Sequence, residues 1–373
     1  MRFLHTGDWH IGKNLAGYSL LTDQHATFQK IVEIAKQEQV DAVVIAGDLY
    51  DRTIPSEAAT RELMNELVTL NIKASEPLLA ISGNHDSATR LGVGSQWFAS
   101  QNFYLNTDFQ QVFQPVSLKD TQFFLLPFFG LQEVRNYFGD DRIRDVNSAM
   151  KRIVKRMKTK FDPTQKHVLV AHFFAAGSTR TADSETMIEV GGLSAVNTSL
   201  LSDFDYVALG HLHNKNALNE ERIKYSGSPM KFSVSEAHME KGVWIVDTNP
   251  FSIKWVKIPP IHDIHVIEES MKTLTSTAFA NQYPKDDYYA IRLTDRQIIP
   301  DVMHRLRQYY PYIISLGRKY GFDSPQQKKR QFNRKLAPDK LFANFYRQTV
   351  GVDLDTEQQQ IVKKSLEQVQ KEN

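Results

Sequence analysis

Five short segments of the chain combine residue types that bind divalent metal ions. Carboxylate, imidazole and amide oxygen suit Mn²⁺, Fe²⁺ or Zn²⁺. The chain has no cysteine, which excludes thiolate metal sites, a disulfide framework and a Cys nucleophile. The residue types therefore predict a centre for hard or borderline divalent metals. The segments are Gly7-Asp8-Trp9-His10, Gly47-Asp48-Leu49-Tyr50-Asp51, Gly83-Asn84-His85-Asp86, His172 and Gly210-His211-Leu212-His213.

Each of these segments follows an apolar run that predicts a buried strand. Functional loops of an open α/β sheet cluster beyond the carboxyl ends of its strands, so the polar side chains are expected to converge. Residues at positions x and x+2 of an extended segment point the same way, and Asp8/His10 and His211/His213 are expected to act as such pairs. The runs are Phe3-Leu4, Val43-Val44-Ile45, Leu78-Leu79-Ala80-Ile81, Val168-Leu169-Val170 and Val207-Ala208-Leu209.

The elements that position these segments alternate along the first 260 residues, which is typical of a layered α/β domain. Amphipathic spacing predicts helices over residues 22–38 and 55–70, with Ser56 as a candidate cap of the second. Strands are predicted over residues 2–6, 41–46, 77–82, 123–127, 167–171, 206–209, 222–226, 242–247 and 252–258.

Pro259-Pro260 interrupts this alternation and predicts a domain boundary. Residues 1–260 are expected to form the catalytic domain. Residues 261–322 are expected to form a small α+β domain, with strands at 262–268, 288–293 and 312–316, a helix between the first two strands and a second helix at 300–310. Residues 323–373 are expected to form a polar linker and two helices, at 338–350 and 356–369.

Composition narrows the function classes further. The 45 Lys and Arg residues against 43 Asp and Glu residues give a net charge of +2, so a nucleic-acid surface would have to come from local clustering. No stretch reaches ~18 uninterrupted apolar residues, and no apolar signal region precedes the first strand. We therefore expect a soluble cytoplasmic protein.

The five segments, in this order, resemble the pattern of the calcineurin-like metallophosphoesterase superfamily. That pattern reads D-x-H, G-D-x-x-D, G-N-H-D, a lone His and G-H-x-H, and the chain departs from it at no ligand position. The resemblance implies a four-layer α/β/β/α sandwich, here extended by a small α+β capping domain and C-terminal helices.

The resemblance also implies a role for each polar residue of the segments. One metal ion is held by Asp8, His10 and His213, the other by Asn84, His172 and His211, and Asp48 bridges them. Mn²⁺ is the expected metal, and two such ions activate water and stabilise the phosphate in hydrolysis. His85 and Asp86 are the catalytic residues: His85 faces the scissile phosphate and Asp86 orients its imidazole.

Further stretches resemble the SbcD family of Mre-type DNA repair nucleases. They are DWHIGK, GDLYDR and SGNHDS, followed later by Tyr225-Ser226-Gly227-Ser228-Pro229, Phe232-Ser233, Glu236 and Lys241-Gly242-Val243. This resemblance implies a 3′→5′ exonuclease on duplex DNA ends with endonuclease activity on single strands or hairpins. It also implies that residues 261–322 gate DNA access and that the subunit forms a homodimer.

The two terminal helices predict a partner, because short amphipathic helices beyond a polar linker cannot bury their apolar faces alone. In the SbcD family this region binds the coiled-coil base of an SbcC-type, SMC-like ATPase. The chain has no G-x-x-x-x-G-K-[ST] loop, so any ATP dependence has to come from that partner. Packing of the helices on the core is the alternative. The apolar residues are Leu341, Phe342, Phe345 and Val350 of the first helix and Ile361, Val362, Leu366 and Val369 of the second.

Cations near the predicted metal centre are candidates for contact with DNA phosphates, namely Lys13, Arg52 and Arg90. Residues 142–167 contain nine Lys and Arg against two Asp, with an apolar stripe at helical spacing. This predicts a helix that packs by the stripe and presents a basic face, either to DNA or only to solvent.

Two other functions are compatible with the same metal centre. A small-molecule or cyclic-nucleotide phosphodiesterase would use the same ligands, but it would need neither a capping domain nor helices awaiting a partner. A non-enzymatic scaffold that binds DNA ends would need no leaving-group residue such as His85.

Overall fold

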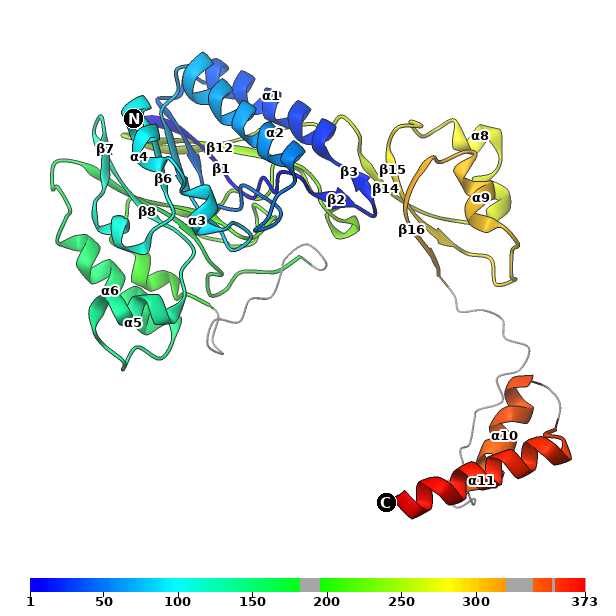
Figure 1. The fold of residues 1–373 in the computed structure, drawn as a ribbon. Coiled ribbons are helices and arrows are strands. Elements are labelled where there is room, and N and C mark those ends of the chain that lie inside the picture. Colours follow the sequence, from blue (N-terminus) through cyan, green and yellow to red (C-terminus); the bar gives the residue numbers. More distant parts are fainter. Residues whose placement is uncertain (182–194, 320–337, 351–352, 373) are drawn as a thin grey trace. The chain divides into compact units, whose positions relative to one another are not determined.

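The computed structural model describes residues 1–181, 195–319, 338–350 and 353–372. The chain divides into two units, Met1–Tyr320 and Gly321–Asn373 (Figure 1). The first unit contains all of the predicted metal ligands, so its sheets determine where those side chains lie.

A six-stranded sheet forms the first half of the core, in the order β13-β12-β1-β4-β5-β6. The strands from β1 to β6 in this order run parallel, whereas β12 runs antiparallel to both of its neighbours. The bounds are β1 Arg2–Thr6, β4 Ala42–Ile45, β5 Leu78–Ile81, β6 Phe103–Asn106, β12 Gly242–Thr248 and β13 Phe251–Lys257.

A five-stranded sheet forms the second half, in the order β11-β10-β9-β8-β7. All of its strands are parallel except β7, which pairs antiparallel with β8. The bounds are β7 Val116–Leu118, β8 Thr121–Leu126, β9 Lys166–His172, β10 Tyr206–Gly210 and β11 Ile223–Tyr225.

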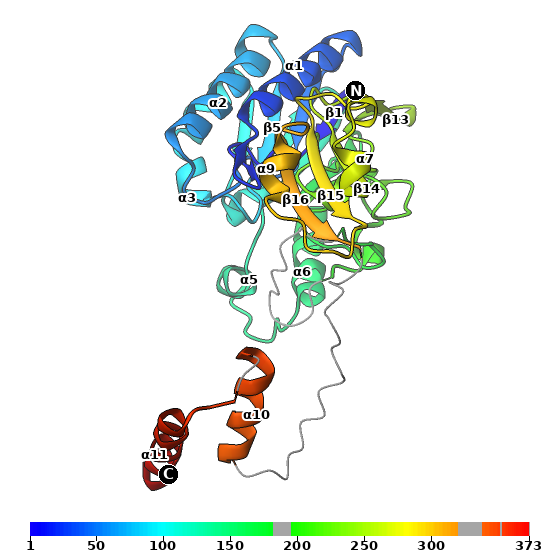
Figure 2. The same cartoon turned by 90° about the vertical axis from the view of Figure 1, so that its right-hand side faces the viewer.

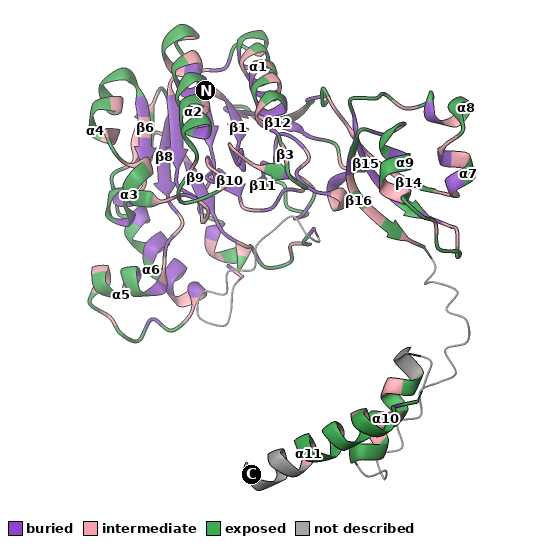
Figure 3. Cartoon of the chain, turned by 45° about the vertical axis from the view of Figure 1, so that its right-hand side comes forward, coloured by how far each residue is buried: buried purple, intermediate pink, exposed green. Residues whose placement is uncertain are grey.

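The two sheets pack face to face, and helices cover both outer faces. Along β4 and just after it, Val43 and Ile45 join the cluster under α1 and α2, whereas Val44 and Ala46 join the cluster between the sheets. A third cluster lies between the second sheet and α5 and α6. Figure 3 shows the buried strands between their partly exposed helices. The predicted α/β/β/α order of layers is therefore confirmed. The helices are α1 Leu21–Gln37, α2 Glu57–Val68, α5 Leu131–Phe138 and α6 Val146–Lys158.

Helix α6 illustrates how the sequence pattern becomes packing. Asp145 caps its first turn in a reciprocal capping box with Ser148. Met150, Ile153 and Met157 are fully buried in the cluster beneath the second sheet. The lysines and arginines of this helix are all exposed, so the predicted packing stripe and basic face are confirmed.

A three-stranded parallel sheet, β14-β15-β16, follows the Pro259-Pro260 break and faces the viewer in Figure 2. Two short helices, rather than one, connect its first two strands. Its bounds are β14 Ile264–Glu269, α7 Met271–Leu274, α8 Thr277–Ala280, β15 Tyr288–Leu293, α9 Val302–Arg307 and β16 Tyr312–Arg318.

An apolar cluster connects this sheet to the two-sheet core. Leu15, in the short strand β2 (Asn14–Leu15), and Leu20, which follows its partner strand β3 (Tyr18–Ser19), pack with Phe232 and with Tyr288 of β15. Buried Asp23 of α1 accepts a hydrogen bond from the Tyr288 hydroxyl (3.2 Å) and pairs with His262 (2.9 Å). The connection is therefore both apolar and polar.

The second unit contains two helices, α10 (Pro338–Val350) and α11 (Thr356–Glu372). Phe342 and Phe345 are about half exposed, at 45% and 46%, and Ile361 is 59% exposed. The side chains of Val350 and Val369, and the predicted linker over residues 323–337, lie outside the described residues. Of the six predicted apolar residues that the structure describes in this unit, Phe342, Phe345 and Ile361 are exposed, whereas Leu341, Val362 and Leu366 are partly buried.

Candidate metal centre

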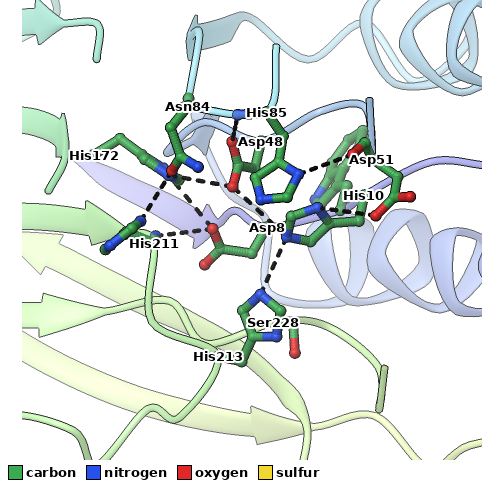
Figure 4. A network of polar contacts seen from close by, with 12 residues as sticks. Asp8, His10, Asp48, Asp51, Asn84, His85, His172, His211, His213 and Ser228 are labelled. Atoms are coloured by element: carbon green, nitrogen blue, oxygen red, sulfur yellow. Dashed lines mark hydrogen bonds and ion pairs between the residues drawn. The ribbon is translucent and has the colours of Figure 1, made fainter. Parts of the chain in front are cut away.

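The polar side chains of the five segments gather at one edge of the two sheets. They follow β1, β4 and β5 of the first sheet and lie at or just beyond the ends of β9 and β10 of the second. These strands are parallel within each sheet, so their carboxyl ends share an edge. Figure 4 shows all seven predicted ligands turned toward one another.

The backbone is left-handed at four of the predicted ligands, with φ of 52° at Asp8, 46° at His10, 51° at Asp48 and 95° at His211. Such conformations cost about 1–3 kcal/mol each and concentrate at functional sites. Asp8/His10 and His211/His213 each bring two side chains to the cluster, but the expected extended backbone is wrong, because Asp8, His10 and His211 have positive φ. Sharp turns aim these side chains, and amide hydrogen bonds from Asp8 to the Gly47 carbonyl and from His10 to the Asp48 carbonyl (3.0 Å each) hold the first of them.

One group of potential ligand atoms comes from Asp8, His10 and His213, which are all buried and whose ligand atoms lie within 4.8 Å of one another. The two Nε2 atoms of the histidines are 3.1 Å apart. Among the described residues, the Oδ2 atom of Asp8 has no hydrogen-bond partner. Buried polar atoms without partners are rare, and a cation between these three side chains would satisfy the Asp8 oxygen.

A second group contains Asn84, His172 and His211. The Oδ1 atom of Asn84 lies 2.9 Å from Nε2 of His172 and 3.0 Å from Nδ1 of His211. Nδ1 of His172 is hydrogen-bonded to the Ala46 carbonyl (2.8 Å), so its Nε2 is the nitrogen turned toward the group. An amide oxygen and two imidazoles form a donor set that suits a first-row divalent ion.

Asp48 lies between the two groups. Its Oδ2 atom is 3.6 Å from Nε2 of His10 and 3.3 Å from Nε2 of His172. Its Oδ1 atom accepts a hydrogen bond from the backbone amide of His85 (2.9 Å). One carboxylate thus approaches ligands of both groups, which is the position that a bridging ligand requires.

The electrostatics of this cluster show a carboxylate and an imidazole that stabilise each other. Burial favours the neutral form of both, but the Asp48–His172 interaction outweighs it: the pKa of Asp48 lies well below its ordinary value and that of His172 is raised to about 9. Burial raises the pKa of Asp8 to about 6 and holds that of His10 well below its ordinary value. Metal binding would replace the proton on His172.

His85 is partly buried beside the cluster, and Asp86, the next residue, is buried. Nδ1 of His85 lies 2.9 Å from the Asp51 carbonyl, and its ring packs edge-to-face on His10. The Asp86 carboxylate accepts hydrogen bonds from the backbone amides of Leu49, Tyr50 and Gly83 and so joins the second and third segments. The sequence did not predict this clamp, and orientation of His85 by Asp86 stays a prediction.

The three predicted DNA-contacting cations differ in their surroundings. Lys13 forms an ion pair with Asp51 (2.7 Å), and Arg52 approaches the same carboxylate at 3.5 Å while its side chain stays 71% exposed. Arg90 is exposed on the short helix α3 (Ala88–Leu91), which follows the Asn84–Asp86 segment. Lys13 and Arg52 therefore lie beside the cluster through Asp51.

Glu236 and Lys241 form a buried ion pair beneath His213. The Glu236 carboxylate lies 3.1 Å from Nδ1 of His213. Burial alone would raise the pKa of Glu236, but Lys241 and His213 hold it well below its ordinary value. Both residues belong to stretches that resemble the SbcD family, but the sequence predicts no role for them, because spacing does not show which polar residues of a loop become buried.

A two-layered sheet core with this cluster of carboxylate, imidazole and amide ligands at its strand ends defines a metallophosphoesterase. The family model of the calcineurin-like phosphoesterases matches residues 1–215, and a model described as the type 5 capsule protein repressor C-terminal domain matches residues 260–350. The chain belongs to the calcineurin-like phosphoesterases.

Its relatives define the branch within that superfamily. The chain is 34% identical to the SbcD subunit of the SbcCD nuclease of Staphylococcus epidermidis over 97% of both chains. It is 33% identical to the SbcD subunit of Staphylococcus saprophyticus, over 98% of this chain and 97% of that one. The chain is therefore a member of the SbcD family. Among solved structures, a dimetal phosphatase from Danio rerio aligns with 70% of this chain and 98% of its own, at 14% identity and a TM-score of 0.42.

Within the described ranges, none of the helices has the length and apolar character needed to cross a membrane.

Proposed function

We propose that this chain is the nuclease subunit of an SbcCD-type complex and hydrolyses DNA phosphodiesters in the processing of double-strand breaks and hairpins. Its activities are 3′→5′ exonuclease on duplex ends and endonuclease on single strands or hairpins. The observation that carries the proposal is the convergence of all seven predicted ligands with His85, in a chain that matches SbcD subunits over nearly its full length.

Two divalent ions, with Mn²⁺ as the preferred metal, belong to this site. Asp8, His10 and His213 hold one ion, Asn84, His172 and His211 hold the other, and Asp48 bridges them. When bound, the ions supply Lewis-acid activation of water and of the phosphate. The unpartnered Asp8 oxygen and the position of Asp48 between both groups support this assignment.

His85 stabilises or protonates the leaving oxygen of the DNA backbone. It is partly buried, its Nδ1 lies at the Asp51 carbonyl, and its backbone amide donates a hydrogen bond to Asp48. These contacts fix the imidazole beside the metal ligands, which is where a proton donor to the leaving group has to be. Lys13, Arg52 and Arg90 contact phosphates on either side of the cleavage point.

The chain has three domains with separate roles. Residues 1–260 form the nuclease domain and residues 261–322 form the capping domain that controls DNA access. Residues 323–373 bind the base of the coiled coil of an SbcC-type, SMC-like ATPase. The exposed side chains of Phe342 and Ile361 support this last role, because apolar residues on one face of a helix are typical of helix-in-groove binding.

The subunit acts as a homodimer within a heterotetramer. A candidate surface lies on α2, the turn that follows it and the neighbouring α4 (Ser95–Phe98), where Met64, Val68, Ile72 and Trp97 are 39–81% exposed. These side chains surround a cavity of about 300 Å³. Exposed apolar side chains that lie next to one another often mark protein–protein interfaces.

The test is a metal-dependent cleavage assay with three substrates: labelled duplex DNA, single-stranded DNA and bis-p-nitrophenyl phosphate. Each is incubated with Mn²⁺ or with chelator, with and without the SbcC-type ATPase and ATP. His85→Ala is the catalytic variant. His25→Ala is its matched control, because His25 is an exposed histidine of α1 that pairs with Glu62 rather than with a predicted ligand.

Mn²⁺-dependent DNA cleavage that is lost in His85→Ala and kept in His25→Ala is the expected result. Cleavage of the small ester alone, with none of DNA even in the presence of the ATPase and ATP, would instead identify a small-molecule phosphodiesterase. DNA processing by the complex that survives Asp48→Ala would identify a scaffold.

A further inference from the structure

A network of buried polar residues underlies His213, on the side of the ring that faces away from His10. Glu236 and Ser228 are fully buried and Lys241 is 5% exposed. The Oε1 atom of Glu236 accepts the Nδ1–H of His213 (3.1 Å) and its Oε2 atom pairs with the Lys241 ammonium. The Ser228 hydroxyl lies 3.2 Å from the same Oε2 atom.

Lys241 also holds the backbone of His213. Its ammonium donates to the His213 carbonyl (2.9 Å) and to the Ser228 hydroxyl (2.7 Å), besides its contact with Glu236. A lysine has three N–H donors, and all three have partners here. A buried ion pair is tolerated when its remaining hydrogen bonds are satisfied, so this pair is a stable fixed element.

The network fixes both the ring and the tautomer of His213. A carboxylate only accepts hydrogen bonds, so the proton of the neutral imidazole lies on Nδ1. The lone pair is then on Nε2, the nitrogen that lies 3.1 Å from Nε2 of His10. The Phe232 ring packs against both histidines and limits rotation further.

His172, in the other group, has a different kind of support. Its Nδ1 is held by the backbone carbonyl of Ala46 (2.8 Å), a neutral acceptor that no side-chain substitution removes. Of these two histidines, His213 is therefore the one whose Nδ1 is hydrogen-bonded to a carboxylate rather than to a backbone carbonyl. A carboxylate on the far nitrogen also makes an imidazole a stronger metal ligand.

We propose that Glu236 and Lys241 are positioning residues for His213, which fix its tautomer and orientation for the metal ion shared with Asp8 and His10. This inference rests on the proposed two-metal function. It predicts that loss of the pair weakens one of two metal-binding steps and leaves the other intact, because the support of His172 is separate.

The decisive variant is the double substitution Glu236→Gln/Lys241→Met, which removes both charges and leaves neither one buried alone. Ser228→Ala is a milder variant that removes one acceptor of the Lys241 ammonium and keeps both charges. The matched control is Lys231→Met/Asp263→Asn, which deletes another lysine–carboxylate pair (2.6 Å) whose lysine side chain is only 10% exposed and which does not contact a predicted ligand.

Each metal-free protein is titrated with Mn²⁺ by calorimetry, and its thermal unfolding is followed in chelator and in Mn²⁺. We expect one binding step of the double variant to weaken by about 10–100-fold. The increase in melting temperature caused by Mn²⁺ should shrink accordingly. Ser228→Ala should weaken the same step by a smaller factor. The control pair should bind Mn²⁺ as the wild type does, even if its melting temperature in chelator is lower.

The inference would be overturned if the double variant binds Mn²⁺ with wild-type affinity at both steps and loses as much melting temperature in Mn²⁺ as in chelator. The pair would then have a purely structural role. If the double variant does not fold, wild-type Mn²⁺ affinity of the Ser228→Ala protein at both steps would overturn the inference. A wild-type protein that binds fewer than two Mn²⁺ ions would refute the proposed two-metal function instead.

Discussion

Gly83→Ala tests whether the position of Asp48 controls the metal centre. A Cβ atom on Gly83 would lie 2.1 Å from Oδ1 and 2.4 Å from the backbone nitrogen of Asp48. Real Cβ atoms essentially never approach closer than 3.0 Å, so these atoms must separate by a further 0.9 Å (3.0 − 2.1) and 0.6 Å (3.0 − 2.4). The backbone contact means that rotation of the Asp48 side chain alone cannot relieve the clash.

The expected effect has two parts. Overpacking of this kind destabilises a protein by about 1–3 kcal/mol. A displacement of about 1 Å at a catalytic group reduces turnover by roughly 10²-fold. Because Asp48 approaches ligands of both groups, we expect Gly83→Ala to weaken Mn²⁺ binding and to slow hydrolysis of bis-p-nitrophenyl phosphate by about that factor.

The assay combines urea unfolding, calorimetric Mn²⁺ titration and steady-state hydrolysis. Gly130→Ala is the matched control: its backbone also has an ordinary φ, and a Cβ there meets nothing within 4 Å. Hydrolysis and Mn²⁺ affinity at wild-type levels in a folded Gly83→Ala protein would refute the reasoning. It would mean that the loop yields without moving the carboxylate.

Three further predictions concern protons and metal. His85→Ala should reduce hydrolysis by roughly 10²–10⁴-fold while calorimetry shows unchanged Mn²⁺ affinity; lost metal binding would identify His85 as a ligand. Mn²⁺ affinity should increase as the pH rises toward about 9, because the metal competes with the proton on His172. Burial lowers the pKa of His172, but Asp48 raises it to about 9. An affinity that does not change between pH 7 and pH 9 would contradict this prediction. Burial and nearby Glu62 raise the pKa of Glu66 well above its ordinary value, so the stability of the wild type should fall as the pH rises through that pKa. Glu66→Gln should not lose stability in this way. Its free energy of unfolding in urea, relative to that of the wild type, should therefore be higher at pH 8 than at pH 5.

The sequence alone predicted the strands that carry the site. β1 has the predicted bounds, and β4, β5 and β10 agree within one residue. A strand buried on both faces needs a continuous apolar run, and such a run is visible without any structure. The short edge strand β6, Phe103–Asn106, and the β2–β3 pair were not predicted, because elements of this length have too little periodicity to be distinguished from loops.

The identity of the polar cluster could likewise be predicted from sequence, since five segments of metal-binding residues each follow a buried strand. Their local geometry could not. Asp8, His10 and Asp48 are aimed by left-handed turns, which depend on hydrogen bonds between segments far apart in the chain.

Only the tertiary structure decided which residues support the ligands. Asp86 joins two loops through backbone amides, and Glu236 and Lys241 hold His213 from a segment more than 20 positions away. Strand periodicity and ligand order are local properties of a sequence. Which polar side chain becomes buried against which ligand depends on how distant segments pack, and that is a property of the folded chain.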